Sequence, residues 1–325
     1  MGSKNINELL NIDKIYNGCF PCKDLLGLEL LDKRTLQTIL RVAAYFKQAL
    51  VKPNHKSSIL DGKTLITLFY EPSTRTRISF ELAAKKLSAD VINIAINTSS
   101  ITKGENLIDT GKTLEAMKAD YIILRHYFSG APNILAKYLT TSIINAGDGE
   151  HEHPTQGLLD LYTIYEYKKD FSNLKVLLVG DILHSRVAKS NIWALTKMGA
   201  QVSVVGPPTL VPCYIKNLGV KVYYNFDEAI IQADVINMLR IQFERQQENF
   251  FPSIREYVKL YQLTKQRLLL ANPNVLVMHP GPMNRGIEIS SDVIEEYHNT
   301  VVNKQVTNGI AIRMAILYLL NKRRC

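Results

Sequence analysis

Short apolar segments rich in β-branched residues alternate with amphipathic helical segments along most of the chain, in two successive series. Their spacing predicts a first set of strands at residues 64–70, 91–96, 121–125 and 142–145. Helices are expected before and between these strands, near residues 32–50, 74–87, 106–118 and 132–138. After a helix near residues 155–167, a second set of strands is expected at residues 176–179, 201–205, 221–224, 235–238 and 275–278.

Both series have the pattern of parallel sheets, because their strands are apolar on both faces and are joined by helices. We therefore expect two doubly wound α/β domains, residues 1–147 and 148–303, divided near the Gly-Asp-Gly segment at 147–149. A final helix within residues 304–325 is long enough to return to the first domain. Since ligands of such sheets bind where strands end, the active site is expected there, in the cleft between the domains.

The composition is that of a folded globular protein, with 46% hydrophobic and 21% charged residues among 325. Apolar runs are too short for a membrane helix, since even the stretch at 310–320 is interrupted by Arg313. No secretion signal or lipid anchor is expected. Four cysteines are too few for a disulfide framework, so the sequence predicts a reducing, cytoplasmic location and free thiols at Cys19 and Cys22.

The net charge of +9 would suit nucleic acid, an anionic membrane or small acidic ligands. The basic residues are dispersed along the chain, and no nucleic-acid-binding motif accompanies them. We therefore expect neither a nucleic-acid partner nor a membrane partner, and small anions become the preferred ligands.

The most informative motif is Tyr-Glu-Pro-Ser-Thr-Arg-Thr-Arg at residues 70–77, between a predicted strand and a predicted helix. The start of a helix presents unpaired N–H groups and a partial positive charge, so hydroxyl and guanidinium groups there form a cradle for an anion. Helix capping alone would account for one hydroxyl, but not for three beside two arginines. Arg75 is assigned to the ligand. Arg77 is assigned to the scaffold, since Glu81 lies four residues later and suits an ion pair.

Other polar groups follow predicted strands or begin helices in both halves of the chain. His153 and Gln156 are three residues apart at a helix start and therefore share one face, with His153 expected to be partly exposed. Arg240 and Gln242 follow a buried strand and face the same side of an extended chain. The remaining candidates for an anion-binding surface are Arg125, Arg186 and the His-Pro-Gly-Pro-Met-Asn-Arg-Gly segment at 279–286.

Two cofactor motifs are incomplete, and no metal site is expected. The Gly-Lys-Thr segment at 111–113 ends like a phosphate-binding loop, but Asn106 stands where the first glycine belongs. The segment after the strand at 176–179 lacks the second and third glycines of a dinucleotide-binding turn. His151 and Glu152 have no further ligand at zinc-like spacing. We therefore predict a reaction without cofactor or metal.

Together these motifs resemble the transcarbamoylase family, from about residue 24 to the end of the sequence. Ser-Thr-Arg-Thr-Arg followed by Ser-Phe-Glu, within residues 73–81, is characteristic of that family. His-Pro-Thr-Gln at 153–156 and the segment at 279–286 resemble the branch that uses aspartate, because the ornithine branch carries cysteine in both segments. The resemblance implies transfer of the carbamoyl group from carbamoyl phosphate to L-aspartate in pyrimidine synthesis. It also implies a homotrimer, which regulatory or other pathway subunits can join.

The resemblance also assigns roles to individual residues. It implies that the phosphate is held by Ser73, Thr74, Arg75, Thr76 and Arg125. It implies that the carbonyl oxygen is polarised by Thr76, Arg125 and His153. The carbamoyl amino group would meet Gln156 and the carbonyls of Gly281 and Pro282, which a cis bond joins; some family members have leucine in place of Gly281. The aspartate carboxylates would be bound by Arg186, Arg240 and Gln242, and a neighbouring subunit would supply Ser99 and Lys103.

The chemistry is consistent with these residue types. Carbamoyl phosphate is already activated, so no protein nucleophile is required, and the enzyme has to position two anions and stabilise an oxyanion. Two alternatives stay open from the sequence. One is a transcarbamoylase for another acceptor, which would need acidic groups or an apolar pocket in place of Arg186 and Arg240. The other is a phosphate-binding module without activity.

Overall fold

The computed structural model describes residues 12, 14–51, 56–94, 105–242 and 253–324. The chain divides into two compact units, one formed by Met1–Leu158 with Thr307–Cys325 and the other by Leu159–Val306. The chain passes from the first unit to the second after Leu158, later than the expected boundary at 147/148. The reason is that the turn after residue 148 is still hydrogen-bonded to the first unit. Glu152, for example, accepts the N–H of Leu28 at 2.9 Å.

The first unit contains a four-stranded parallel sheet in the order β2-β1-β3-β4. Its strands are β1 (Thr64–Phe69), β2 (Asp90–Ile94), β3 (Tyr121–His126) and β4 (Ser142–Asp148). Its helices include α2 (Lys33–Val51), α3 (Thr74–Lys86), α4 (Leu107–Ala116) and α5 (Ala131–Tyr138). These elements were predicted, with differences at their ends; residues 95 and 96 of the second predicted strand lie outside the described residues.

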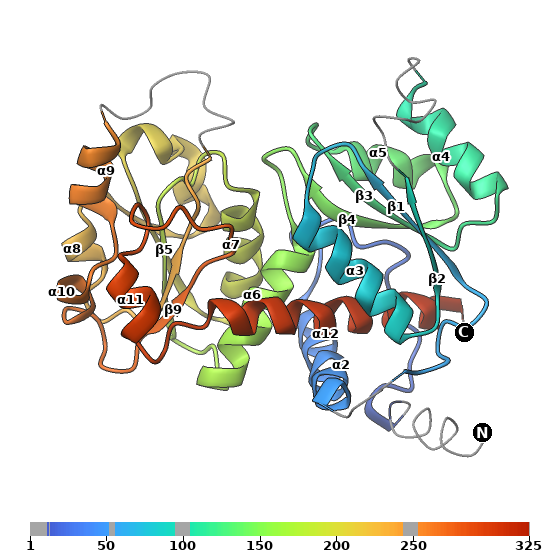
Figure 1. Cartoon of the computed structure of the whole chain (residues 1–325), viewed down its shortest axis with the longest axis horizontal. Coiled ribbons are helices and arrows are strands. Elements are labelled where there is room, and N and C mark those ends of the chain that lie inside the picture. Colours follow the sequence, from blue (N-terminus) through green and yellow to red (C-terminus); the bar gives the residue numbers. More distant parts are fainter. Residues whose placement is uncertain (1–11, 13, 52–55, 95–104, 243–252, 325) are drawn as a thin grey trace. The chain divides into compact units, whose positions relative to one another are not determined.

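The strands β1, β3 and β4 are buried on both faces, as their apolar sequences predicted, whereas the edge strand β2 is largely exposed, with Ile92 51% exposed. One face forms a cluster with α4 and α5, made by Ile66, Leu68, Leu114, Ile122, Leu124, Leu135 and Ile143. The residues between them along the strands, such as Leu65 and Ile123, are fully buried on the opposite face. Figure 1 shows α4 and α5 on one side of the strands and α3 on the other.

The second unit contains a five-stranded parallel sheet in the order β7-β6-β5-β8-β9. Its strands agree with the prediction to within one residue at each end: β5 (Lys175–Val179), β6 (Gln201–Val205), β7 (Lys221–Tyr223), β8 (Val235–Met238) and β9 (Leu276–Met278). Its helices include α7 (Arg186–Met198), α8 (Phe226–Ala229), α9 (Ile254–Tyr261), α10 (Lys265–Leu268) and α11 (Ser291–Glu296).

One face of the second sheet packs against α8, α9 and α11. This cluster includes Leu177, Val179, Phe226, Ile236, Met238, Tyr257 and Val293. The alternate strand residues, such as Leu178 and Val204, are fully buried on the other face. Two doubly wound α/β domains are therefore present, as the sequence predicted.

Each sheet reverses its winding direction next to its first strand. In the first unit the chain runs from β1 outward to β2 and then continues with β3 on the other side of β1. In the second unit it runs from β5 through β6 to β7 and continues with β8 on the other side of β5. Ligands of open α/β sheets bind at such switch points, at the carboxyl ends of the two central strands. The loops after β1 and β3, and after β5 and β8, are therefore the places to examine.

Two helices, α6 (Pro154–Lys168) and α12 (Val302–Asn321), continue along the chain from one unit into the other. Arg313, which interrupts the apolar run of α12, is 3% exposed. Its guanidinium stands over the Phe80 ring at 4.9 Å, Nη1 donates to Gly309 O at 2.9 Å, and burial lowers its pKa to about 9. Among the described residues, none of the helices has both the length and the apolar character that a membrane span requires. Cys19, Cys22 and Cys213 are free thiols.

Candidate active site

The turn from β1 into α3 carries the hydroxyl and guanidinium groups of the first motif. Ser73 occupies the N-cap position of α3, but its side chain caps no backbone N–H and instead donates to Thr76 Oγ1 at 3.0 Å. Thr76 is buried, whereas Thr74 and Arg75 are exposed. Since the Ser73 side chain caps no N–H of α3 in the described part of the chain, these backbone donors are compatible with the anion cradle expected from the sequence.

The predicted ion pair between Arg77 and Glu81 is wrong. Among the described residues, Glu81 pairs with Lys85 at 2.6 Å and accepts from Asn93 Nδ2 at 3.2 Å. The hydrogen bond from Lys85 is the largest cause that lowers the pKa of Glu81, and Arg77 contributes through its charge alone. A glutamate four residues before a cation is the better orientation along a helix, and Glu81 has that relation to Lys85 and the reverse one to Arg77.

Arg125 is held next to this turn at the carboxyl end of β3. It pairs in register with Phe69 at the end of β1 and is only 9% exposed. Its Nη1 donates to Ala146 O at 3.1 Å, and its Nη2 forms an ion pair with Glu71. The guanidinium is therefore fixed from two sides, by β4 and by the loop that leads to Ser73.

His153 lies directly before α6, and Gln156 lies one turn into it. The carbonyl of His153 accepts the N–H groups of Gln156 at 2.9 Å and Gly157 at 3.1 Å. The expectation that His153 is partly exposed is wrong, because its exposure is 6%. The chain turns back on itself just before His153, where Asp148 N donates to Glu152 O at 3.2 Å. His153 therefore follows a hydrogen-bonded turn and does not stand at an open helix end.

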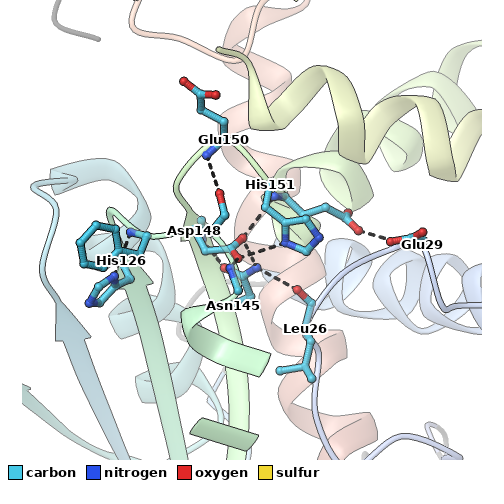
Figure 2. A network of polar contacts seen from close by, with 12 residues as sticks. Leu26, Glu29, His126, Asn145, Asp148, Glu150 and His151 are labelled. Atoms are coloured by element: carbon cyan, nitrogen blue, oxygen red, sulfur yellow. Dashed lines mark hydrogen bonds and ion pairs between the residues drawn. The ribbon is translucent and has the colours of Figure 1, made fainter. Parts of the chain in front are cut away.

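The turn before His153 is organised by the buried carboxylate of Asp148 (Figure 2). Asp148 accepts N–H groups from Gly130 at 2.7 Å, Asn145 Nδ2 at 2.8 Å and Glu152 at 3.2 Å. Its other contact is with His151 Nδ1 at 3.0 Å, and this hydrogen bond is the main cause that raises the pKa of His151. Asp148 thus ties the loop after β3 to the loop after β4, and these loops follow Arg125 and precede His153.

Glu29 joins His151 and Glu152 in a group whose potential metal-ligand atoms all lie within 4.8 Å of one another. No sequence pattern indicates this third residue, since it lies far away along the chain. Both oxygens of Glu152 accept the N–H of Leu28 at 2.9 Å, and Oε1 also accepts the N–H of Glu29 at 3.1 Å. These bonds give the buried carboxylate a structural role that needs no metal ion.

In the second unit, Arg186 begins α7 after the loop that follows β5. Ser185 caps this helix by accepting the N–H of Ala188 at 3.1 Å. Arg186 is 5% exposed. In the same loop, the backbone N–H of His184 donates to the buried Asp181 at 3.1 Å, and His184 Nδ1 lies 3.0 Å from that carboxylate. The loop that presents Arg186 is therefore held by contacts between its own residues.

Arg240 and Gln242 lie in the loop after β8, which contacts the loop after β5. Gln242 Nε2 donates to His184 O at 2.9 Å, and the Gln242 N–H points to Asp181 Oδ2 at 3.5 Å. Arg240 is half-buried. The switch point between β5 and β8 therefore carries the three candidates Arg186, Arg240 and Gln242 on two connected loops.

The segment after β9 contains a cis Gly281–Pro282 bond, which confirms that prediction. Gly281 N donates to His279 Nδ1 at 2.8 Å. The fully buried Glu288 accepts from Asn284 N and Nδ2, both at 2.7 Å, and from Ile241 N at 3.1 Å. Glu288 therefore connects this segment to the loop that carries Arg240 and Gln242.

Sequence reasoning missed the acidic residues that hold these loops. Glu71 and Asp181 each come two residues after the end of a strand, and this position was a signal that could have found them. Glu288 has no comparable signal, since its partners lie in two other segments. The predicted residues Ser99 and Lys103 lie outside the described residues.

Comparison with known families decides what the chain is related to. Residues 23–166 match the "Aspartate/ornithine carbamoyltransferase, carbamoyl-P binding domain", and residues 172–320 match the corresponding "Asp/Orn binding domain". The chain belongs to the aspartate/ornithine carbamoyltransferase family. The two matches fall largely on the two units of the fold, the first on the sheet with Ser73 and Arg125 and the second on the sheet with Arg186 and Arg240.

The chain is similar to family members named for aspartate and to one named for ornithine. The aspartate carbamoyltransferase catalytic subunit of Endomicrobium trichonymphae is 69% identical over 303 residues, which are 93% of this chain and 97% of the relative. The solved catalytic subunit of M. Jannaschii aspartate transcarbamoylase has a TM-score of 0.80 and 36% identity, covering 92% of this chain and 98% of that one. The ornithine carbamoyltransferase of Pyrococcus furiosus has a TM-score of 0.80 and 33% identity, covering 91% and 96%. The family fold therefore serves either acceptor, and the site residues have to distinguish them.

Proposed function

We propose that the two switch points hold the two substrates of aspartate carbamoyl transfer. The chain transfers the carbamoyl group of carbamoyl phosphate to the amino group of L-aspartate, giving N-carbamoyl-L-aspartate and phosphate in pyrimidine synthesis. The relative with 69% identity carries this activity in its name. The observation that carries the residue assignment is the arrangement of cations and hydroxyls at the carboxyl ends of β1 and β3, and of arginines at the ends of β5 and β8.

The phosphate half-site consists of Ser73, Thr74, Arg75, Thr76 and Arg125. Phosphate is a dianion with several acceptor oxygens, so it suits a helix N-terminus combined with hydroxyl and guanidinium donors. The ion pair with Glu71 fixes the direction of the Arg125 guanidinium before the ligand arrives, which reduces the ordering that binding requires.

The chemical step needs donors for a developing negative charge. When the aspartate amine attacks the carbonyl carbon, the carbonyl oxygen becomes an oxyanion. Phosphate then leaves with the bonding electron pair and takes up the proton that the amine nitrogen releases. We assign the oxyanion contacts to Thr76, Arg125 and His153. Fixed donors of this kind stabilise the transition state more than the ground state. Gln156 and the carbonyls of Gly281 and Pro282 would bind the carbamoyl amino group.

The acceptor half-site consists of Arg186, Arg240 and Gln242. Aspartate brings two carboxylates, and two guanidinium groups with one amide supply matching donors. A cationic acceptor such as ornithine would require a carboxylate free to meet it. Among the described residues next to this half-site, the buried acids Asp181 and Glu288 are already engaged by N–H groups. The half-site therefore favours aspartate.

The acceptor is tested by offering the purified chain carbamoyl phosphate with equal concentrations of L-aspartate, L-ornithine or putrescine and identifying the products by mass spectrometry. We expect carbamoyl-aspartate as the dominant product. Faster carbamoylation of ornithine than of aspartate would overturn the acceptor assignment, and no turnover with any acceptor would favour a phosphate-binding module.

We also propose that the enzyme works as a cytoplasmic homotrimer whose active sites are shared between subunits. The free thiols agree with a reducing compartment. The resemblance to the family places Ser99 and Lys103 in the site of a neighbouring subunit. Such a trimer can also bind regulatory or other pathway chains, as the family resemblance implies.

Subunit sharing predicts complementation between two inactive variants. Lys103→Ala and His153→Ala proteins, unfolded and reassembled together, should regain activity, because some sites combine an intact His153 with an intact Lys103 from the neighbour. Random mixing in equal amounts would make roughly a quarter of the sites intact. Verified mixed trimers that stay as inactive as both parents would show that Lys103 acts within its own chain or not at all.

A further inference from the structure

A fully buried carboxylate on α6, Asp160, connects three elements of the second unit. Its Oδ1 accepts from Gln305 Nε2 at 2.8 Å, and its Oδ2 accepts from Asn191 Nδ2 at 2.8 Å and Asn237 Nδ2 at 3.4 Å. We propose that Asp160 is a positioning residue for the second unit's part of the active site. The inference rests on the proposed function, because it concerns how the residues assigned there are held.

The first connection leads to the segment that contains the cis Gly281–Pro282 bond. Gln305 stands near the start of α12, and its Nε2 is fixed by Asp160. Its Oε1 therefore points the other way and accepts the N–H of His279 at 3.0 Å, at the end of β9. His279 in turn accepts the N–H of Gly281 at 2.8 Å. Asp160 thus sets, through Gln305, the direction in which the 279–282 segment leaves the sheet.

The other two connections lead to the acceptor half-site. Asn191 lies on α7, which begins with Arg186, and Asn237 lies on β8, three residues before Arg240. By accepting from both amides, Asp160 fixes the rotation of α7 relative to β8. The distance between the two guanidinium groups depends on that rotation.

A carboxylate is required at this position for a chemical reason. Within the described part of the chain, the side-chain oxygens of Asn191 and Asn237 are buried without a hydrogen-bond partner, so these amides are oriented by their N–H groups. The three donors named above are all amide N–H groups, and a carboxylate offers acceptors on both of its oxygens. Asparagine at position 160 would turn an NH₂ group toward at least one of these donors and leave it without an acceptor.

The test compares Asp160→Asn with Thr163→Val, a matched control on the same helix. Thr163 is also fully buried, and its hydroxyl donates to Leu159 O at 2.7 Å within α6, so its loss reports general damage to the helix. In Asp160→Asn we expect KM for aspartate to rise by about 10-fold or more and kcat to fall, since a displacement near 1 Å can cost up to about 10²-fold. The inhibition constant of inorganic phosphate should change by less than about twofold, because its half-site lies in the first unit.

Each outcome distinguishes a positioning role of Asp160 from a general effect on the stability of the fold. Kinetic constants equal to those of Thr163→Val would overturn the proposal, and so would a parallel loss of phosphate inhibition, which would indicate general damage. If wild type itself fails to use aspartate, the proposed function fails before this comparison is made.

If Asp160→Asn does not fold, Gln305→Met tests the first connection alone. Methionine keeps the size of the side chain but removes the acceptor for the N–H of His279. This variant should lower kcat while leaving phosphate inhibition unchanged. A kcat within twofold of wild type would overturn the positioning role.

Discussion

Replacing His153 with alanine is expected to lower kcat by about 10²–10³-fold, or roughly 3–4 kcal/mol, because in the proposed mechanism it removes one donor to the oxyanion. Loss of a fixed donor acts on the transition state, where the charge develops, and less on substrate binding. The measurement is steady-state kinetics with both substrates varied. KM for carbamoyl phosphate should change much less than kcat.

The control has to account for the burial of His153, since removing a buried ring can also destabilise the fold. Thermal unfolding should show that the variant is folded at the assay temperature. His298 is exposed, so His298→Ala gives the same chemical change outside the site and should leave kcat unaltered. His153→Gln, which keeps a hydrogen-bond donor, should recover part of the rate. A kcat decrease below about threefold in His153→Ala would mean that His153 serves only as a helix-start residue.

The strands were predictable because each is short, apolar on both faces and separated from the next by a clear helical or turn segment. The run 201–205 is an example, since its bounds agree with β6 at both ends. The domain boundary was harder to place because Gly147 and Gly149 indicate a turn, but not which unit the turn belongs to. The hydrogen bonds from Leu28 and Glu29 to Glu152 decide that, and their partners are more than a hundred residues apart.

The candidate ligands were predictable for a related reason. Arg125 stands at the end of its strand, and Ser73 and Arg240 lie in the loops that follow theirs. The carboxyl ends of parallel strands share one edge of a sheet. The burial of His153 was not predictable, because it follows from the fold of the turn at 148–152. The partner of Glu81 could have been chosen from helix orientation alone, since both Arg77 and Lys85 are visible at four-residue spacing.

The supporting carboxylates lie beyond local sequence reasoning. Asp160 lies inside α6 and Gln305 in the first turn of α12, 145 residues apart along the chain, and neither position indicates a partner at that distance. Glu288 binds the N–H groups of Ile241 and Asn284, from two separate segments. Both units share one arrangement: the cationic groups proposed to bind substrate are placed by strand ends, and buried acids fix the loops that present them.

Replacing Arg240 with alanine is expected to raise KM for aspartate by about 10²-fold, or about 2–3 kcal/mol, while KM for carbamoyl phosphate changes little. The guanidinium would pair with a substrate carboxylate, and truncating one partner of such a pair leaves the other without its contact. The effect should fall on aspartate because Arg240 lies in the loop after β8, whereas the phosphate half-site lies in the first unit. Steady-state kinetics with aspartate varied at saturating carbamoyl phosphate measures it.

Arg285→Ala is the matched control, since it removes the same side chain from an exposed position in the adjacent segment. Arg285 forms an ion pair with Glu295 at 3.3 Å, and both side chains are more than half exposed, so its loss should cost little stability. If net positive charge alone attracted aspartate, both variants would raise KM by similar amounts, and added salt would reduce the difference from wild type. If a specific contact with Arg240 binds aspartate, only Arg240→Ala should raise KM for aspartate. An equal loss for aspartate and carbamoyl phosphate in Arg240→Ala would remove Arg240 from the acceptor half-site.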